Sequence, residues 1–459
     1  MTVAAGLPAP NGAPLGINAR SSVGGGGVHR AGGQGGDRSI RYRLLSVVQR
    51  LLLRSDVEPG RQDRVCRCHF SRKAQTVTVR RNRATGRASY SGLETCSNVW
   101  ACPVCNGRIT ERRREQLQMA VGAWKKQGGE CYLVTLTFPH QRADHLGRLV
   151  ELMRQAADKF NTRTSVRRAR ERAGYIGSIR ALEVTWGSWH GWHPHFHLLY
   201  FCAAGQQAEL QKLQGAWVEC LVAVGLADRS QQNDMLTGAA GLSPAFDVQN
   251  GDYAAEYIAK FGHDPSLQSK IETGATWGAA AELTKGMSKT GRRLSGVTPF
   301  TLLAVAAGTC EVRGLTKGRA IALFCEFAVA FKGQRQLYWS PRLKKTLYLG
   351  ELFTDAELME LENRRPDQDD VCELSADDWR LLLAHRCRDE GLVAGEVGSL
   401  ADGAAAIRAL LAELRARPAV HPPGLSQWRH DGRYVEGVDT PRVDTHAEFK
   451  LRLKMERLG

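Results

Sequence analysis

Three segments between residues 130 and 202 alternate apolar and polar positions as half-buried β-strands do. They read ECYLVTLTF from residue 130, SIRALEVTW from residue 178 and HPHFHLLYF from residue 193. In the third strand His195 and His197 share one face because they are two residues apart. The turn GSWHG joins the second strand to the third, so we expect a hairpin that brings Glu183 beside both histidines.

Helical periodicity marks two other parts of the chain. Residues 147–160 and 375–417 carry apolar residues at the three- and four-residue spacing of an amphipathic helix. Between them, the Gly-, Thr- and Lys-rich stretch TKGMSKTGRRLSGVTP separates the strand-containing core from an apolar helical region that begins at Phe300.

Composition and patterning divide the chain into six regions. We expect a largely disordered N-terminal region at 1–60, because glycine is abundant and large apolar residues are few at its start. The others are a Cys-rich zinc-binding segment at 61–110, a core of strands and helices at 111–270, a basic linker at 271–298, a helical C-terminal region at 299–420 and a charged tail at 421–459.

The charge of the chain indicates a polyanionic partner. The 459 residues carry a formal net charge of +16, and 43% are apolar, which is ordinary for a globular protein. We see neither an apolar run of the roughly 20 residues that a membrane span needs nor the apolar core of a signal peptide. We therefore expect a cytoplasmic protein that binds nucleic acid.

Five clustered cysteines have the spacing of a metal site. CRCHF contains Cys66 and Cys68, and TCSNVWACPVC contains Cys96, Cys102 and Cys105. A C-x2-C pair directs two thiolates at one zinc ion, and Cys96 with Cys68, or alternatively Cys66, can complete a tetrahedral shell. Such a zinc would be structural, since four protein ligands leave no position for substrate. The alternative is a set of buried free thiols.

Glu183, His195 and His197 suit a divalent cation, with His193 as an alternative third ligand. Two imidazoles and a carboxylate that face one point leave coordination positions open for a phosphate oxygen. A single histidine on a strand is usually a core residue, whereas two at this spacing beside an acidic residue favour a metal site.

The segment GDYAAEYIAKFG supplies a candidate nucleophile. On a helix, Tyr253, Tyr257 and Lys260 project from one face, with Glu256 about 100° away. The ammonium group of Lys260 would stabilise a tyrosine phenolate that attacks a phosphodiester. The alternative is an amphipathic helix that packs on the sheet through its two tyrosines.

Together these segments resemble the HUH endonuclease superfamily, and most closely its rolling-circle plasmid replication initiators, the Rep proteins. LVTLTF resembles their first motif, HPHFHLLYF the metal motif and EYIAKF the tyrosine motif. The knuckle CSNVWACPVC and the later PFTLLAVAAG and FKGQRQLYWSPRLKK resemble a Rep group with an N-terminal zinc-binding part. The resemblance spans residues 64–350 and implies an α+β fold, in which a central antiparallel sheet, flanked by helices, carries the histidine strand near its middle. Region 111–270 would be the endonuclease core.

The resemblance also implies roles for the site residues. His195, His197 and Glu183 would bind Mg2+ or Mn2+, and Tyr257, assisted by Lys260, would attack the scissile phosphate. The tyrosine would stay linked to the 5' end and free a 3' hydroxyl that primes synthesis. Strand rejoining would use Tyr253 or Glu256, and the sequence leaves that choice open. The partners would be single-stranded, melted or hairpin origin DNA together with a host helicase and polymerase, in a bacterial cytoplasm.

Other functions share part of this pattern. Relaxases and single-strand transposases have the histidine and tyrosine motifs but do not imply the knuckle. From another class, a non-enzymatic zinc-dependent DNA-binding protein would use the histidines structurally, and a metal-dependent hydrolase would use activated water. The basic runs RRNR at 80–83, RRR at 112–114 and RRARER at 167–172 could contact phosphates in any of these proteins.

Overall fold

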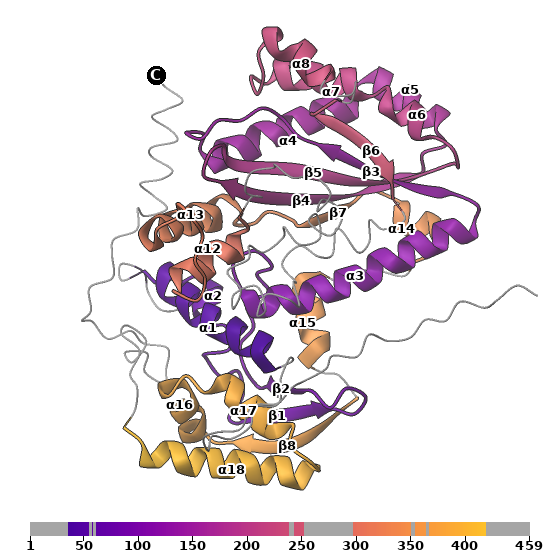
Figure 1. Ribbon diagram of the computed structural model, residues 1–459. Helices are drawn as coiled ribbons and strands as arrows, with labels where there is room; N and C mark the ends of the chain where they lie inside the picture. Colours follow the sequence, from indigo (N-terminus) through magenta and orange to yellow (C-terminus); the bar gives the residue numbers. More distant parts are fainter. Residues whose placement is uncertain are drawn as a thin grey trace, which may run out of the picture.

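The three predicted strands form the centre of a five-stranded sheet in the computed structural model (Figure 1). The structure describes residues 35–54, 57, 61–237, 243–251, 297–349, 354–363 and 367–418. The strand order is β6-β3-β5-β4-β7, and every neighbouring pair is antiparallel. The bounds are β3 Glu130–Leu136, β4 Gly177–Gly187, β5 Gly191–Cys202, β6 Phe246–Asn250 and β7 Leu337–Trp339. The histidine strand β5 is thus central.

Helices cover both faces of this sheet, because successive residues of each strand point to opposite sides. On one face, Phe160 of α4 (Leu146–Thr162) contacts Phe246 of β6, with ring centroids 6.2 Å apart. On the other face, Leu117 and Val121 of α3 (Pro103–Lys126) join a buried cluster with Leu199 and other strand residues. Helix α3 lies along the side of the sheet opposite α4 (Figure 1).

The hairpin of β4 and β5 sets the register on which the site depends. Glu183 pairs with His195, Ala181 with His197, and the ladder continues to Gly187 opposite Gly191. On the other side of β5, Thr135 of β3 pairs with His197. By alternation, the two histidines, Glu183 and Thr135 point to the same face of the sheet as Leu199. They lie further along the strands than the apolar residues that pack against α3.

A second sheet joins residues from the two ends of the described chain. Its order is β2-β1-β8, with bounds β1 Val77–Asn82, β2 Ala88–Ser91 and β8 Gln368–Leu374. Arg80 of β1 pairs with Asp370 of β8 at 2.8 Å, and Arg83 pairs with Asp369 at 2.7 Å. Strands that are almost 300 positions apart therefore lie side by side at the lower end of the molecule (Figure 1).

Helix α1 (Gly35–Leu52) lies inside region 1–60, which was predicted to be largely disordered, and that prediction is wrong for this part. Glycines dominate only up to Gly36, after which Leu44, Leu45 and Val48 supply a buried apolar face. This face packs with the cysteine-rich segment in one core cluster. Residues 1–34 lie outside the described residues.

The C-terminal region is largely helical, as predicted, but it also supplies β7 to the first sheet and β8 to the second. The remaining helices are α2 Arg64–Arg67, α5 Thr164–Arg172, α6 Gln207–Gln211, α7 Gln214–Ala223, η2 Arg229–Gln231, α8 Gln232–Leu236, α12 Pro299–Ala306, α13 Lys317–Ala330, α14 Leu343–Thr346, α15 Asp355–Asn363, α16 Ala376–Ala384, α17 Arg388–Gly395 and α18 Leu400–Ala416.

The predicted α+β fold, with a mainly antiparallel sheet, flanking helices and a cysteine cluster near the N-terminus, is confirmed. Most of the predicted basic linker and the whole charged tail lie outside the described residues. Among the described helices, none is long and apolar enough to cross a bilayer.

Candidate metal centres

Glu183, His195 and His197 are buried and meet on the face of the central sheet that α3 packs against. The Oε2 atom of Glu183 lies 3.3 Å from Nε2 of His195 and 3.3 Å from Nε2 of His197. One potential ligand atom from each of the three side chains lies within 4.8 Å of the other two. This carboxylate and pair of imidazoles could hold a metal ion.

The other ring nitrogen of each histidine is held by a neighbouring group. Nδ1 of His195 lies 3.2 Å from the backbone carbonyl oxygen of His193, and Nδ1 of His197 lies 3.0 Å from the hydroxyl of Thr135. Metal-binding histidines commonly use one nitrogen for such an orienting hydrogen bond and the other for the ion. The arrangement directs both Nε2 atoms toward Glu183 and fits a metal centre.

The charge state of Glu183 also fits this role. Burial opposes its ionisation, but the imidazoles of His197 and His195 outweigh burial and lower the pKa of the carboxyl to about 2. The side chain of Glu183 is therefore a carboxylate anion at neutral pH and can bind a cation. The side chains of His195 and Glu183 keep 11% and 10% of their surface exposed and that of His197 keeps 4%, so the group is largely buried and His197 lies deepest.

His193, the alternative ligand, is adjacent to this group but not part of it. Its Nδ1 lies 3.3 Å from Nδ1 of His140, which lies in the loop after β3. The rings of His193 and His195 are 5.1 Å apart. Burial lowers the pKa of His193 to about 3, so this imidazole is neutral near pH 7.

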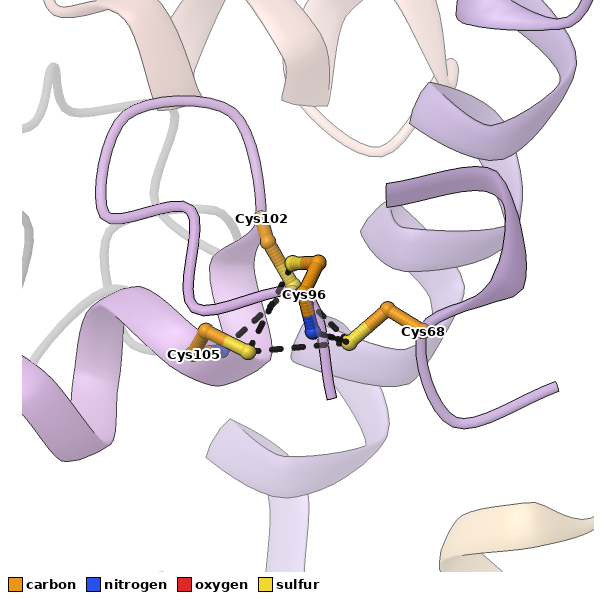
Figure 2. A group of neighbouring side chains, drawn as sticks. All are labelled: Cys68, Cys96, Cys102 and Cys105. Atoms are coloured by element: carbon orange, nitrogen blue, oxygen red, sulfur yellow. Dashed lines mark hydrogen bonds between the residues drawn. The ribbon is translucent and has the colours of Figure 1, made fainter. Parts of the chain in front are cut away.

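Four cysteines form a second, fully buried group (Figure 2). Cys68 follows α2, Cys96 lies in a loop, and Cys102 and Cys105 lie at the start of α3, where the thiol of Cys102 caps the helix. The Sγ–Sγ distances are 3.6 Å from Cys105 to both Cys68 and Cys96, and 3.7 Å from Cys102 to Cys68.

These distances match a tetrahedral metal site. Zn–S bonds of about 2.3 Å place the sulfur atoms of a tetrahedron about 3.8 Å apart. The backbone N–H groups of Cys96, Asn98 and Cys105 each donate to a cluster sulfur at 3.4 Å, which favours thiolates. Hydrogen bonds from the other three thiols lower the pKa of Cys105 well below its usual value. The cluster could therefore bind a metal such as zinc.

Cys66, the alternative to Cys68, points elsewhere. Its thiol is buried and donates to the backbone carbonyl of Gln49 on α1 at 3.7 Å. The side chain of Gln49 in turn donates to the backbone carbonyls of Cys66 and Cys68, at 3.2 and 2.8 Å. Of the two residues in CRCHF, only Cys68 is in the four-cysteine group.

The predicted nucleophile and its neighbours lie outside the described residues. Tyr253, Glu256, Tyr257 and Lys260 follow Gly251, the last described residue after β6. The structure therefore describes the part of the predicted active site that is expected to bind a metal ion, and not the part that carries the tyrosines.

Several arginines of the predicted phosphate-binding runs are engaged within the protein. Arg80 and Arg83 pair with carboxylates of β8, and Arg113 pairs with Asp355 at 2.8 Å. Arg170 contacts the rings of Phe160, Tyr175 and Tyr200, with its guanidinium carbon 5.1 to 5.5 Å from their centroids. These side chains stabilise the fold. Less positive charge is therefore available to bind DNA than the sequence suggests.

Comparison with known proteins identifies the family. A family model described as a replication protein matches residues 91–218, which include Cys96, the CPVC knuckle and the histidine strand. A protein from Streptomyces lividans named "Protein rep" is 30% identical over 327 residues, which cover 61% of this chain and 69% of the relative.

The chain belongs to the replication (Rep) protein family. The predicted Rep resemblance is thereby confirmed. A protein from Streptomyces cyanogenus named "Neomycin resistance protein" is also 37% identical to this Rep chain over 140 residues, 25% of the chain and 32% of that protein. No solved structure matches the Rep chain. The family match ends at residue 218, before the segment that carries Tyr257.

Sequence reasoning missed the groups that orient the site. The alternation of β3 predicts the face on which Thr135 lies. Its contact with His197, however, depends on the register between β3 and β5, which are more than 50 residues apart. Arg388 of α17 is buried against the cysteine-rich segment and donates to the backbone carbonyl of His69 at 2.8 Å. Only the tertiary structure brings that arginine to the segment.

Proposed function

We propose that this Rep protein initiates rolling-circle replication of a plasmid by nicking one strand of the origin through an HUH-type tyrosine mechanism. The observation that carries the proposal is the convergence of Glu183, His195 and His197 on one point of a central strand. Membership of the replication protein family supports replication over conjugation or transposition as the setting. The net charge of +16 supports DNA as the partner.

Glu183, His195 and His197 would hold Mg2+ or Mn2+. The resemblance to HUH endonucleases implies these ions, the carboxylate suits them, and three protein ligands would leave positions for other oxygens. A bound cation would orient the scissile phosphate and stabilise the negative charge that develops on its oxygens. Thr135 and the carbonyl of His193 would fix the imidazole orientations before DNA arrives.

The hydroxyl of Tyr257 would attack the phosphorus atom. An O–P bond forms between the tyrosine and the phosphate while the bond from phosphorus to the 3' oxygen breaks. The proton of the tyrosine ends on that 3' oxygen, and Lys260 favours the phenolate during the attack. The products are a 5'-phosphotyrosine link and a 3' hydroxyl that a host polymerase extends, with a host helicase separating the strands.

A second group on the same segment would rejoin the strand. At termination either Tyr253 would cleave the regenerated origin as a second nucleophile, or Glu256 would activate a water molecule for that cleavage. In both cases the 3' hydroxyl released by the cleavage would attack the phosphotyrosine, which closes the strand and frees Tyr257. We expect Tyr253→Phe to reduce strand closure more than initial nicking, when both are followed on one oligonucleotide by denaturing electrophoresis. Equal loss in both steps, or in neither, would exclude Tyr253 and favour Glu256.

Cys68, Cys96, Cys102 and Cys105 would hold a structural zinc ion. The support is the tetrahedral spacing of the four sulfurs and their complete burial. The ion would stabilise the start of α3, whose far half packs on the face of the sheet that bears the histidines.

The nicking proposal is tested by covalent adduct formation. The full-length protein is incubated with Mn2+ and single-stranded oligonucleotides tiled across the replicon that carries its gene. A 3'-labelled oligonucleotide should give a labelled protein band on a denaturing gel, because the downstream fragment, which carries the 3' label, stays linked to the protein through its 5' phosphate. A 5'-labelled one should give a short product that a polymerase extends.

Two variants assign the groups. Tyr257→Phe and His197→Ala should each lose the adduct while single-stranded DNA binding in EDTA is retained. Binding without any adduct from the unaltered protein would support the non-enzymatic DNA-binding function. Nicking that survives Tyr257→Phe and leaves a free 5' phosphate would support the hydrolase.

A further inference from the structure

The turn between β4 and β5 presents a tryptophan to solvent. Trp189 keeps 71% of its surface exposed, whereas Trp186 and Trp192, at the base of the same hairpin, keep 4% and 2%. Removing an indole from water is favourable, so a partner that covered this side chain would gain binding free energy. The position of this turn indicates what that partner is.

The base of the hairpin is anchored, so Trp189 stands on a fixed support. The indole N–H of Trp192 donates to Glu326 of α13 at 2.9 Å, and the other oxygen of Glu326 accepts from the N–H of Leu146 at the start of α4. Gly191 has a φ of +77°, and a side chain there would meet the backbone of Arg142 at 2.9 Å. The close approach fixes the 141–142 backbone against the turn.

A row of imidazoles leads from the Glu183–His195–His197 group to this turn. Ring centroids are 4.7 Å apart for His197 and His195, 5.1 Å for His195 and His193, and 4.6 Å for His193 and His140. His140 and His190, beside Trp189, are 6.4 Å apart. Exposure rises along this histidine row, from the buried His197 to the exposed His190, so the row runs from the Glu183–His195–His197 group to solvent at the turn.

The spacing suits a nucleic acid strand. The Glu183–His195 pair lies four residues along the hairpin from the Gly187–Gly191 pair, a separation of about 13 Å at the rise of a β-strand. A phosphate at the metal group and a base at Trp189 would thus belong to nucleotides only a few positions apart. Exposed Arg142, next to Gly191, adds a positive charge beside the tryptophan.

We propose that Trp189 stacks on a base of the single-stranded DNA a few nucleotides from the scissile phosphate, while Arg142 contacts the backbone of the same strand. The inference rests on the proposed function for the position of that phosphate. Single-stranded DNA is favoured over a protein partner because aromatic faces and arginines are the groups that bind unpaired bases and phosphates. The histidine row connects them to the metal group.

Binding without metal tests this inference separately from nicking. The full-length protein is titrated into 3'-fluorescein-labelled (dT)20 in EDTA, and anisotropy gives Kd. Stacking tolerates any base, so a thymine probe is sufficient. Trp189→Ala should weaken binding about 5- to 100-fold, and Trp189→Phe, which keeps an aromatic face, should remain within about 3-fold of the unaltered protein.

Tyr348→Ala is the matched control. Tyr348 is 87% exposed and follows α14, just before which the backbone N–H of Ser340 donates to the carbonyl of Ser178 at 2.9 Å, at the opposite end of β4 from Trp189. Its loss should leave Kd unchanged. Salt dependence separates the two contacts, because stacking releases no counterions: Trp189→Ala should keep the slope of log K against log salt, whereas Arg142→Ala should reduce its magnitude by about 0.7.

Each outcome bears on one proposal. Unchanged affinity in Trp189→Ala, or an equal loss in Tyr348→Ala, would overturn the stacking inference even if the protein nicks DNA. A selective loss in Trp189→Ala would support it even if no covalent adduct forms, in which case the tyrosine mechanism would fail alone.

Discussion

At the scale of single residues, the candidate active site depends on which ring nitrogen of each histidine faces Glu183. The hydroxyl of Thr135 holds Nδ1 of His197, and the carbonyl of His193 holds Nδ1 of His195. Alternation alone placed Glu183 beside both histidines, because the hairpin turn is short and the strands adjoin in sequence. It could not place Thr135, since the pairing of β3 with β5 bridges more than 50 residues.

Thr135→Val should weaken binding of Mn2+ about 10- to 100-fold, because the substitution keeps the shape of the side chain but removes the hydrogen bond that orients His197. Mn2+ binding is followed by electron paramagnetic resonance of the free ion. Thr137→Val is the matched control, since its hydroxyl bonds the carbonyl of Pro244 at 2.9 Å instead. Equal Mn2+ affinity in both variants would show that the Thr135 hydroxyl does not orient the site.

At the scale of elements, the basic helix α5 combines two kinds of arginine. Arg170 lies among three aromatic rings and donates to Asn161 at 2.8 Å, whereas Arg167 and Arg168 are exposed. The sequence RRARER suggested either DNA contact or a solvated helix end, and it could not distinguish these residues. Their difference arises from packing of α5 beside Tyr200 of β5 and Tyr175.

Arg170→Met should lower the free energy of unfolding by about 2 kcal/mol, through loss of the cation–π contacts and charged hydrogen bonds. Arg168→Met should change it by less than about 0.5 kcal/mol, as exposed substitutions usually do. Urea denaturation followed by circular dichroism measures both. A similar change in the two variants would mean that Arg170 is not a structural residue.

At the scale of the whole molecule, the four-cysteine group joins the N-terminal and C-terminal parts of the described chain. Tyr42 of α1 contacts Nδ1 of His69 at 3.1 Å, and Arg388 of α17 donates to the His69 carbonyl and to Ser46 of α1. Tyr90 of β2 donates to the backbone carbonyl of Arg388 at 2.7 Å. The cysteine spacing was evident in the sequence, because all four cysteines lie between residues 68 and 105.

The partners of that cluster were not evident, for two physical reasons. The apolar positions of α1 follow directly after a Gly-rich stretch, so composition averaged over 1–60 obscured Leu44, Leu45 and Val48. Strand β8 contains Asp369 and Asp370, whose charges obscure the strand pattern in the sequence. In the fold, Asp370 pairs with Arg80 of β1 and Asp369 pairs with Arg83, the residue after β1. Both elements are specified by contacts with distant segments.

Removal of metal from the four-cysteine group should loosen α1 and α17 together while the central sheet stays ordered. Both helices contact the segment that the four cysteines hold, whereas β3 and β5 have a separate ladder. Hydrogen–deuterium exchange with and without a strong zinc chelator measures this, and zinc added back should restore protection. Faster exchange spread evenly over β3 and β5, or none in α1 and α17, would contradict this view of the cluster.

The central claim is that a tyrosine beyond the histidine strand β5 becomes covalently linked to DNA. The most direct measurement is mass spectrometry of the Mn2+-dependent adduct after digestion with trypsin and nuclease. The account predicts one modified peptide with a 5'-linked nucleotide on Tyr257, absent when EDTA replaces Mn2+. Nicked DNA with a free 5' phosphate and no nucleotide on Tyr257 or Tyr253 would contradict it.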